Sequence, residues 1–123
     1  MGIIAGSGLY ELFGPDASSR IIPTPYGETS APIALGSIGG RDVAFLTRHG
    51  AGHSVPPHRI NFRANIWALR TLGVRNLLTF SAVGGLRPEC GPGQFVLTDQ
   101  IIDRTHGRAD TFFDGDVLKA TGV

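Results

Sequence analysis

The sequence predicts an α/β fold with a central, largely parallel sheet flanked by helices, and two observations lead to it. The chain begins with a short apolar run that passes through a glycine loop into a helix-like segment. Further along, an apolar strand at residues 43–46 is followed by an amphipathic helix and then by a second apolar run at residues 76–80. This order of strand, helix and strand is typical of parallel strands joined by a right-handed crossover. Ligands usually bind at the carboxyl ends of such strands.

Composition predicts one soluble domain that binds something small. The 123 residues are 41% hydrophobic and 17% charged, with a net charge of +1. No basic block or acidic tail suggests a nucleic-acid or membrane partner. The single cysteine, Cys90, cannot form an internal disulfide, and we see neither a secretory signal nor an apolar stretch long enough to span a membrane. We therefore expect a cytoplasmic protein.

The first loop has the composition of a phosphate cradle. Residues 3–5 predict a strand, residues 9–13 predict a short helix, and Gly-Ser-Gly at 6–8 joins them. Several backbone N–H groups and the Ser7 hydroxyl would then point at one spot beside the helix dipole. The loop matches neither the Walker pattern nor a complete dinucleotide fingerprint. A plain glycine turn is the alternative.

A predicted hairpin places two basic residues, Arg48 and His49, just after the end of its second strand. The apolar runs 33–38 and 43–46 flank the turn-forming residues 39–42. Arg48 and His49 leave the end of the second run. Arginine offers a planar fork of donors that matches phosphate or carboxylate, and histidine adds a donor whose charge changes near neutral pH. The pair predicts an anion site, with a solvated turn as the alternative.

An amphipathic helix is predicted before Gly73, which suits its C-terminal stop. Its apolar stripe consists of Phe62, Ile66 and Leu69, at positions i, i+4 and i+7. Trp67 lies beside the stripe and is interpreted as a core residue rather than a stacking platform.

The apolar run 76–80 predicts a strand buried on both faces, and residues 94–98 predict another strand. Ser81 and Ala82 follow the first of these. If the ends of the three strands meet, their side chains would form a single oxyanion site. Its members would be Ser7, Arg48, His49 and Ser81.

The remaining candidate residues carry weaker signals. Asp99 and Asp103 suggest paired carboxylates, although a strand cap and a salt bridge with Arg104 are the preferred interpretation. His53 and His58 precede the helix and either line a pocket or lie exposed. We find no cysteine–histidine metal spacing, so no metal is expected. The sequence also has no G-x-S-x-G nucleophile elbow.

Four stretches in the same order resemble the methylthioadenosine phosphorylase family, which includes methylthioinosine phosphorylases and is related to purine nucleoside phosphorylase. They are GIIAGSGLY at 2–10, TRHGAGHSVPPHRINFRANIWALR at 47–70, SAVGGLRPECGPGQFVLTDQIIDRT at 81–105 and FFDG at 112–115. The resemblance implies a nucleoside phosphorylase fold with a twisted sheet, assembled as trimers or hexamers. It also implies a pentosyltransferase of purine salvage. Phosphate would attack C1′ of S-methyl-5′-thioadenosine or S-methyl-5′-thioinosine and release the purine and 5-methylthioribose 1-phosphate.

The resemblance also implies a set of phosphate-binding residues and no cofactor beyond inorganic phosphate as co-substrate. The residues that match the family pattern are Ser7, Arg48, His49, Ser81 and Ala82. Ala5 departs from the pattern, because the family commonly has glycine there.

Family members run to about twice this length. Their purine-side residues lie in the half that would follow Val123, so residues 1–123 correspond to the N-terminal, phosphate-binding part of a single phosphorylase domain. The purine-binding part is absent, the catalytic residues on the purine side stay unassigned, and we expect the chain alone to be inactive or nearly so. Two alternatives are a non-catalytic module that binds phosphate or pairs with subunits, and a fragment that folds incompletely.

Overall fold

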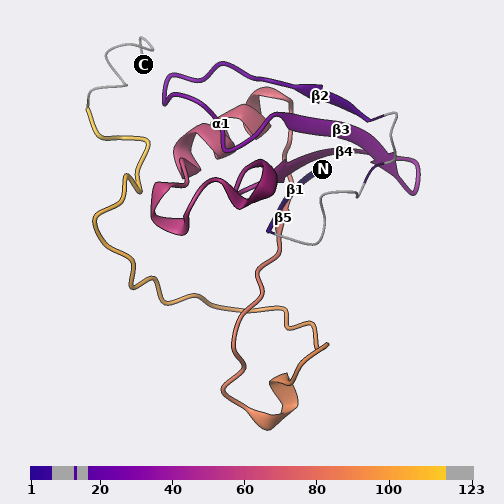
Figure 1. Ribbon diagram of the computed structural model, residues 1–123, viewed down its shortest axis with the longest axis vertical. Coiled ribbons are helices and arrows are strands. Elements are labelled where there is room, and N and C mark those ends of the chain that lie inside the picture. Colours follow the sequence, from indigo (N-terminus) through magenta and orange to yellow (C-terminus); the bar gives the residue numbers. More distant parts are fainter. Residues whose placement is uncertain (7–12, 14–16, 116–123) are drawn as a thin grey trace.

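A computed structural model describes residues 1–6, 13 and 17–115 of the chain (Figure 1). Residues 9–12 of the helix expected at 9–13 and the loop residue Ser7 therefore lie outside the described residues. The regular elements, in chain order, are β1 (Gly2–Ala5), β2 (Ser18–Arg20), β3 (Ile33–Ile38), β4 (Arg41–Thr47), α1 (Phe62–Thr71) and β5 (Leu77–Thr79). Short 3₁₀ turns occupy Ala51–His53, Pro57–Arg59 and Pro88–Cys90.

The five strands form one mixed sheet in the order β2-β3-β4-β1-β5. β1 pairs in parallel with β4 on one side and β5 on the other, which confirms the predicted crossover from β4 through α1 to β5. β3 pairs antiparallel with both β2 and β4. The sheet is therefore mixed rather than largely parallel: it is parallel around β1 and antiparallel from β2 to β4, and the short turn between β3 and β4 requires that pair to run antiparallel.

The predicted hairpin is confirmed, and its turn explains the register. Gly39 and Gly40 have φ angles of 56° and 74°, which only glycine adopts without strain. Two consecutive positive φ values define the two-residue turn whose twist matches that of the flanking strands. Ile38 accordingly pairs with Arg41, so β4 begins two residues earlier than the apolar run at 43–46.

Local capping fixes both ends of α1. The Asn61 side chain accepts a hydrogen bond from the Ala64 N–H at 3.1 Å and caps the N-terminus. At the other end Gly73, with φ 81°, donates to the Arg70 carbonyl at 2.9 Å, and Val74 donates to the Leu69 carbonyl at 3.1 Å. This Schellman motif confirms Gly73 as the stop signal.

The buried face of α1 differs from the predicted stripe. Leu69 is buried as expected, but its buried apolar neighbours are Ala64 and Ala68, while Phe62 and Ile66 are 40% and 36% exposed. Small alanine side chains let the helix approach the sheet closely, so the helix presents this side to the core. The cluster beneath α1 consists of Ile4, Ile33, Ala44, Leu46, Ala68 and Leu69.

The opposite face of the sheet carries a second apolar cluster. Its buried residues come from β1 and β4, and Phe13 packs against them with its ring 6.3 Å from that of Phe45. Among residues 1–6, 13 and 17–115, α1 is the one α-helix, and it covers one face only (Figure 1). The buried residues of this second cluster are Ile3, Ala5, Val43 and Phe45.

β5 lies at the edge of the sheet rather than in its centre. Leu77 and Leu78 are each 41% exposed, so the prediction of a strand buried on both faces is wrong. β5 pairs only with β1 within the described part of the chain, and at this open edge its leucine side chains stay partly accessible to solvent. Nor does the strand predicted at 94–98 form, since this stretch has no neighbouring strand to pair with in the described region.

Residues 81–115, called the arm from here on, run away from the sheet as an irregular chain and return to α1 near their end (Figure 1). Most arm side chains are exposed. The described helices include none with the length and apolar character needed to cross a membrane.

Candidate functional site

The ends of three neighbouring strands meet at one edge of the sheet. The Arg48 N–H, just after β4, donates to the Ala5 carbonyl at the end of β1 at 3.0 Å. The Phe80 N–H, just after β5, donates to the Ile4 carbonyl at 3.0 Å. These bonds extend the parallel pairing by one step beyond the strands, and they confirm that the strand ends converge as the crossover predicts.

The Arg48 side chain lies across this edge and is held from two sides. Its Nε donates to Nε2 of His49 at 3.1 Å, and its Nη1 donates to the Phe80 carbonyl. Its Nη2 lies 3.0 Å from the point where a Cβ on Gly6 would stand. Any side chain at Gly6 would therefore press on the guanidinium, so the glycine makes room for the arginine.

The His49 ring is fixed through both of its nitrogens. Nδ1 lies 3.0 Å from the Val55 carbonyl, and Nε2 accepts the bond from Arg48. The ring also stacks on His53, with centroids 6.1 Å apart and planes 24° apart. His53 has a φ of 60°, which is unusual for a residue with a side chain. Of the two alternatives for His53, the structure thus favours an exposed residue with local contacts.

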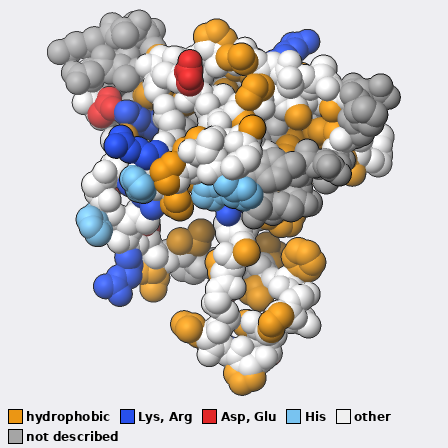
Figure 2. Space-filling view, viewed as in Figure 1, with side chains coloured by type: hydrophobic (Ala, Val, Ile, Leu, Met, Phe, Trp, Pro, Cys, Tyr) orange, Lys and Arg blue, Asp and Glu red, His pale blue; other side chains and the backbone are white. Residues whose placement is uncertain are grey.

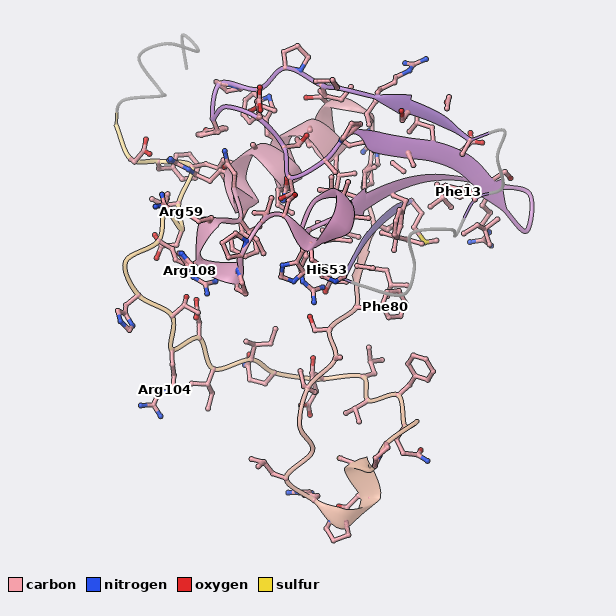
Figure 3. The ribbon with its side chains drawn as sticks, viewed as in Figure 1. Phe13, His53, Arg59, Phe80, Arg104 and Arg108 are labelled. Carbon is pink, nitrogen blue, oxygen red and sulfur yellow. The ribbon has the colours of Figure 1, made fainter. Side chains whose placement is uncertain are left out.

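A hollow of about 960 Å³ opens between this edge of the sheet and the arm (Figure 2). Arg48 lines it from the sheet, and Ser81 and Ala82 line it from the start of the arm. Phe80 and His53 lie at the same end of the sheet in Figure 3. The other lining residues near the strand ends are Ala5, Gly6, Thr79 and Phe80.

The structure brings together three of the five predicted site residues. Arg48, Ser81 and Ala82 line the same hollow. His49 contacts Arg48 but does not line the hollow, and Ser7 lies outside the described residues. A guanidinium, a hydroxyl and a backbone N–H around one space are suited to holding a small anion such as phosphate.

Sequence reasoning missed two contacts of Arg48 at this site. The Phe80 carbonyl accepts from Arg48, and Gly6 leaves space for it. The carbonyl role has no sequence signal, because any residue supplies a carbonyl. The glycine did carry a signal, since a glycine directly after a strand indicates close approach of another group to the backbone.

Among the described residues, the preferred interpretation of Asp99 and Asp103, a strand cap and a salt bridge with Arg104, is wrong for the salt bridge. The Asp103 carboxylate accepts from the Thr105 N–H at 2.8 Å, and this bond lowers the pKa of Asp103 below its usual value. The side chain therefore closes a local turn in the arm and forms no salt bridge with Arg104 within the described residues. No cluster of three or more histidine, cysteine, aspartate or glutamate side chains suited to a metal occurs in the described ranges.

Comparison with known proteins places this geometry in context. The family model of the phosphorylase superfamily matches residues 1–122. The chain is 54% identical over 114 residues to S-methyl-5′-thioadenosine phosphorylase of Mycolicibacterium smegmatis, covering 93% of this chain and 44% of that protein. It is 51% identical to 6-oxopurine nucleoside phosphorylase of Pyrococcus furiosus, covering 94% of this chain and 43% of that protein.

A solved structure supports the same assignment. Methylthioadenosine phosphorylase of Schistosoma mansoni, in complex with adenine, matches with a TM-score of 0.83 and 42% identity over 90% of this chain and 40% of that one. This match confirms the predicted nucleoside phosphorylase fold. The chain spans about two fifths of the length of these relatives. The chain belongs to the phosphorylase superfamily.

Proposed function

We propose that this chain is the phosphate-binding part of an enzyme that cleaves purine nucleosides by phosphorolysis. The substrate would be S-methyl-5′-thioadenosine or S-methyl-5′-thioinosine. The observation that carries the proposal is the position of Arg48, which lies across three converging strand ends and lines a hollow together with Ser81 and Ala82. The names of the similar proteins support the choice of substrate class.

In the proposed reaction a phosphate oxygen forms a bond to C1′ while the bond from C1′ to the purine nitrogen breaks. The purine leaves with the electron pair and takes up a proton, which the attacking hydrogen phosphate gives up, and the products are the free base and 5-methylthioribose 1-phosphate. Phosphate is the co-substrate, and the proposal needs neither a metal nor another cofactor. Residues on the purine side are unassigned.

The site residues would act by holding phosphate in place. Arg48 would balance its charge, while the Ser7 and Ser81 hydroxyls and the Ala82 N–H would orient its oxygens. The arrangement would also stabilise positive charge that develops on the sugar. His49 completes the proposed phosphate set, and its Nε2 accepts a hydrogen bond from Nε of Arg48.

The whole enzyme is proposed to act in the cytoplasm as a homo-oligomer, a trimer or a hexamer, without a nucleic-acid or membrane partner. The base, whether adenine, hypoxanthine or guanine, stays open, because the base-contacting residues are not among those assigned. The chain alone is expected to be inactive or nearly so. Incubation with each nucleoside and phosphate, followed by chromatography of the released purine, tests that expectation, and a normal turnover rate would contradict it.

Phosphate binding is tested by removing the same charge from the two ends of β4. Arg48→Ala should weaken phosphate binding, measured by calorimetry, by about tenfold to a hundredfold, because it removes charge-assisted hydrogen bonds worth about 1.5–3 kcal/mol. Arg41→Ala, at the other end of the strand, is the control and should leave binding unchanged. Equal effects of both variants, or no saturable binding by the unaltered chain at millimolar phosphate, would argue against the proposal.

A second candidate is a non-catalytic module that binds phosphate or pairs with phosphorylase subunits. The exposed edge strand β5 and the apolar side chains of the arm favour it, because both are surfaces that other chains can cover. Size-exclusion chromatography of the chain mixed with a whole phosphorylase tests it. A mixed complex supports pairing, and separate elution contradicts it.

A further inference from the structure

Among the described residues, one polar side chain is buried in the core, and it holds the loop that joins β2 to β3. Asn65 of α1 is 1% exposed. Its Oδ1 accepts from the Ser30 N–H at 2.8 Å, and its Nδ2 donates to the Ser30 hydroxyl at 2.9 Å. A buried amide lowers stability unless its polar atoms are bonded, and these two bonds give both ends of the amide a partner. We call this pair the Asn65–Ser30 clamp.

Asn61, one helical turn before Asn65, holds the same loop. Its Nδ2 donates to the Tyr26 carbonyl at 2.7 Å and to the Glu28 carbonyl at 3.3 Å. Residues four apart lie on the same side of a helix, so both asparagine side chains reach the loop from one side of α1. The loop is therefore fixed to the helix at several points between residues 26 and 30.

The clamp places the Ser30 carbonyl against Gly50, the residue that closes the turn after β4. The Gly50 N–H donates to the Thr47 carbonyl at 3.2 Å. Arg48 and His49 are therefore the two central residues of this turn. Gly50 has a φ of 71°, and a Cβ on it would stand 3.0 Å from the Ser30 carbonyl oxygen. The backbone of the turn thus packs directly against the residue that the clamp holds.

We propose that Asn65 is a positioning residue for the proposed phosphate site, which it reaches through Ser30 and the turn after β4. This inference rests on the proposed function, since it names a further residue that the same site needs. Asn65 does not line the hollow, so it acts through the turn rather than by contact with phosphate. The side chains of Arg48 and His49 leave the chain in directions that the turn sets, so a shift of the turn displaces both of them from the anion.

Amide hydrogen exchange, measured by NMR, tests the clamp without any ligand. Asn65→Ala removes both bonds to Ser30, so the Gly50 amide that closes the turn should exchange about tenfold faster. Gly73→Ala is the control, because it strains the end of α1 at a φ of 81° and lies outside the clamp. A turn opens locally, so Gly73→Ala should leave Gly50 exchange unchanged. Equal acceleration in both variants, or none in Asn65→Ala, would overturn the proposal.

The affinity for inorganic phosphate, measured by calorimetry, tests the consequence for the site. Asn65→Ala should bind phosphate about threefold to tenfold more weakly, because a displaced turn misaligns charge-assisted hydrogen bonds. Gly73→Ala should bind it as the unaltered chain does. An equal loss of affinity in the two variants would mean that lower stability alone weakens binding, and that result would contradict a positioning role.

Substitutions in the loop test the route through Ser30. Ser30→Ala removes the hydroxyl that accepts from Asn65 but keeps the N–H, so we expect a loss of affinity of about twofold to threefold. Thr29→Val is the matched control, since its hydroxyl bonds only to the Ala31 carbonyl at 2.8 Å within the same loop, and it should bind phosphate normally.

The double variant shows whether the two residues act together. Ser30→Ala should cost nothing further once Asn65→Ala is present, because both remove the same contact. Losses of affinity that add would contradict the route through Ser30. If Asn65→Ala does not fold, Ser30→Ala compared with Thr29→Val supplies both measurements, Gly50 exchange and phosphate affinity.

The outcomes distinguish this inference from the proposed function. Unchanged Gly50 exchange and unchanged phosphate affinity in Asn65→Ala overturn the inference and leave the proposed function standing. Faster Gly50 exchange in Asn65→Ala, without phosphate binding by the unaltered chain, supports the clamp and overturns the proposed phosphate site.

Discussion

The sheet body, which comprises the described residues up to 80, and the arm at 81–115 are built from similar apolar residues but differ completely in burial. In the body, Ile33 and Leu46 are 0% exposed between the sheet and α1. In the arm, Leu97 is 96% exposed, although it lies in an apolar run that reads like a strand. Apolar composition therefore sets how much surface is available for burial, and a packing partner decides whether burial happens.

The two regions are also held by different interactions. The body is stabilised by two apolar clusters and strand pairing. The end of the arm is held against α1 by Arg63, which donates to the Thr111 carbonyl at 3.3 Å and pairs with Asp114. Nearby, the Tyr26 ring contacts that of Phe112 with centroids 5.3 Å apart. Such contacts at a partly exposed surface contribute little each, so the arm should open without unfolding the body.

Aromatic packing where the arm meets α1 also shows how Trp67 is packed, which the sequence had predicted to be a core residue. Its ring lies 5.5 Å from that of Tyr26 and is half-buried. Trp67 belongs to neither apolar cluster, so the prediction of a core residue is wrong: the ring packs against Tyr26 on the surface where the arm returns. Arg108 of the arm lies over the Phe62 ring of α1, 5.4 Å from its centroid (Figure 3).

Truncation of a buried leucine should have the largest effect in this comparison. Leu46→Ala leaves a cavity under α1 and should lower the free energy of unfolding by about 2–5 kcal/mol. Leu97→Ala removes the same atoms from the arm and should change it by less than about 0.5 kcal/mol. Urea denaturation measures both. If Leu46→Ala prevents folding, Ile33→Val, with an expected cost of about 0.5–1.5 kcal/mol, replaces it. Equal losses at positions 46 and 97 would contradict the difference between body and arm.

The second-largest difference in stability between body and arm is expected from glycine substitutions. Gly73→Ala forces alanine into a left-handed conformation at the end of α1, which should cost about 1–2 kcal/mol of stability. Gly84→Ala, in the arm, meets open space without a positive φ and is the control, with no measurable change expected. Thermal melting of both variants tests this, and a melting temperature unchanged by Gly73→Ala would refute the role of the Schellman motif.

Release of the arm should be a smaller and local effect. Arg63→Ala removes the bonds to Thr111 and Asp114, so amide hydrogen exchange near residues 108–114 should become faster, by a factor that corresponds to about 0.3–1 kcal/mol. Exchange in β1 and β4 should stay the same. Arg70→Ala, on an exposed position of the same helix, is the control. Unaltered exchange at the end of the arm would mean that the aromatic contacts alone hold it.

The smallest expected effect is the loss of the hydrogen bond between Asp103 and Thr105 at low pH. The Thr105 N–H lowers the pKa of Asp103, so their hydrogen bond is present above the usual carboxyl pKa. It is lost as pH falls below about 4 and through the lowered pKa. An NMR titration should show the Thr105 amide signal moving in this interval, and the shift should vanish in Asp103→Asn. The melting temperature should not follow this titration, because Asp103 is fully exposed.

The sequence by itself determined the features that depend on nearby residues. Gly39 and Gly40 specify the hairpin turn, and Gly73 specifies the end of α1, because a positive φ is a local backbone requirement. The placement of Arg48 and His49 after a strand is local too. The meeting of Arg48 with Ser81 followed from the strand–helix–strand order, which restricts how strand ends can be arranged.

Only the tertiary structure decided which surfaces are covered. The sequence predicted that Phe62 and Ile66 face the core, but the sheet accepts the alanine side of α1, because close approach depends on the shape of both partners. It likewise predicted a buried strand at 76–80, where β5 lies at an edge. The bond between Arg48 and His49 belongs to the same class. Two adjacent residues suggest a shared ligand, and only the structure shows that the Val55 carbonyl, brought in by the following loop, lies 3.0 Å from Nδ1 of His49 while Nε2 accepts from Arg48.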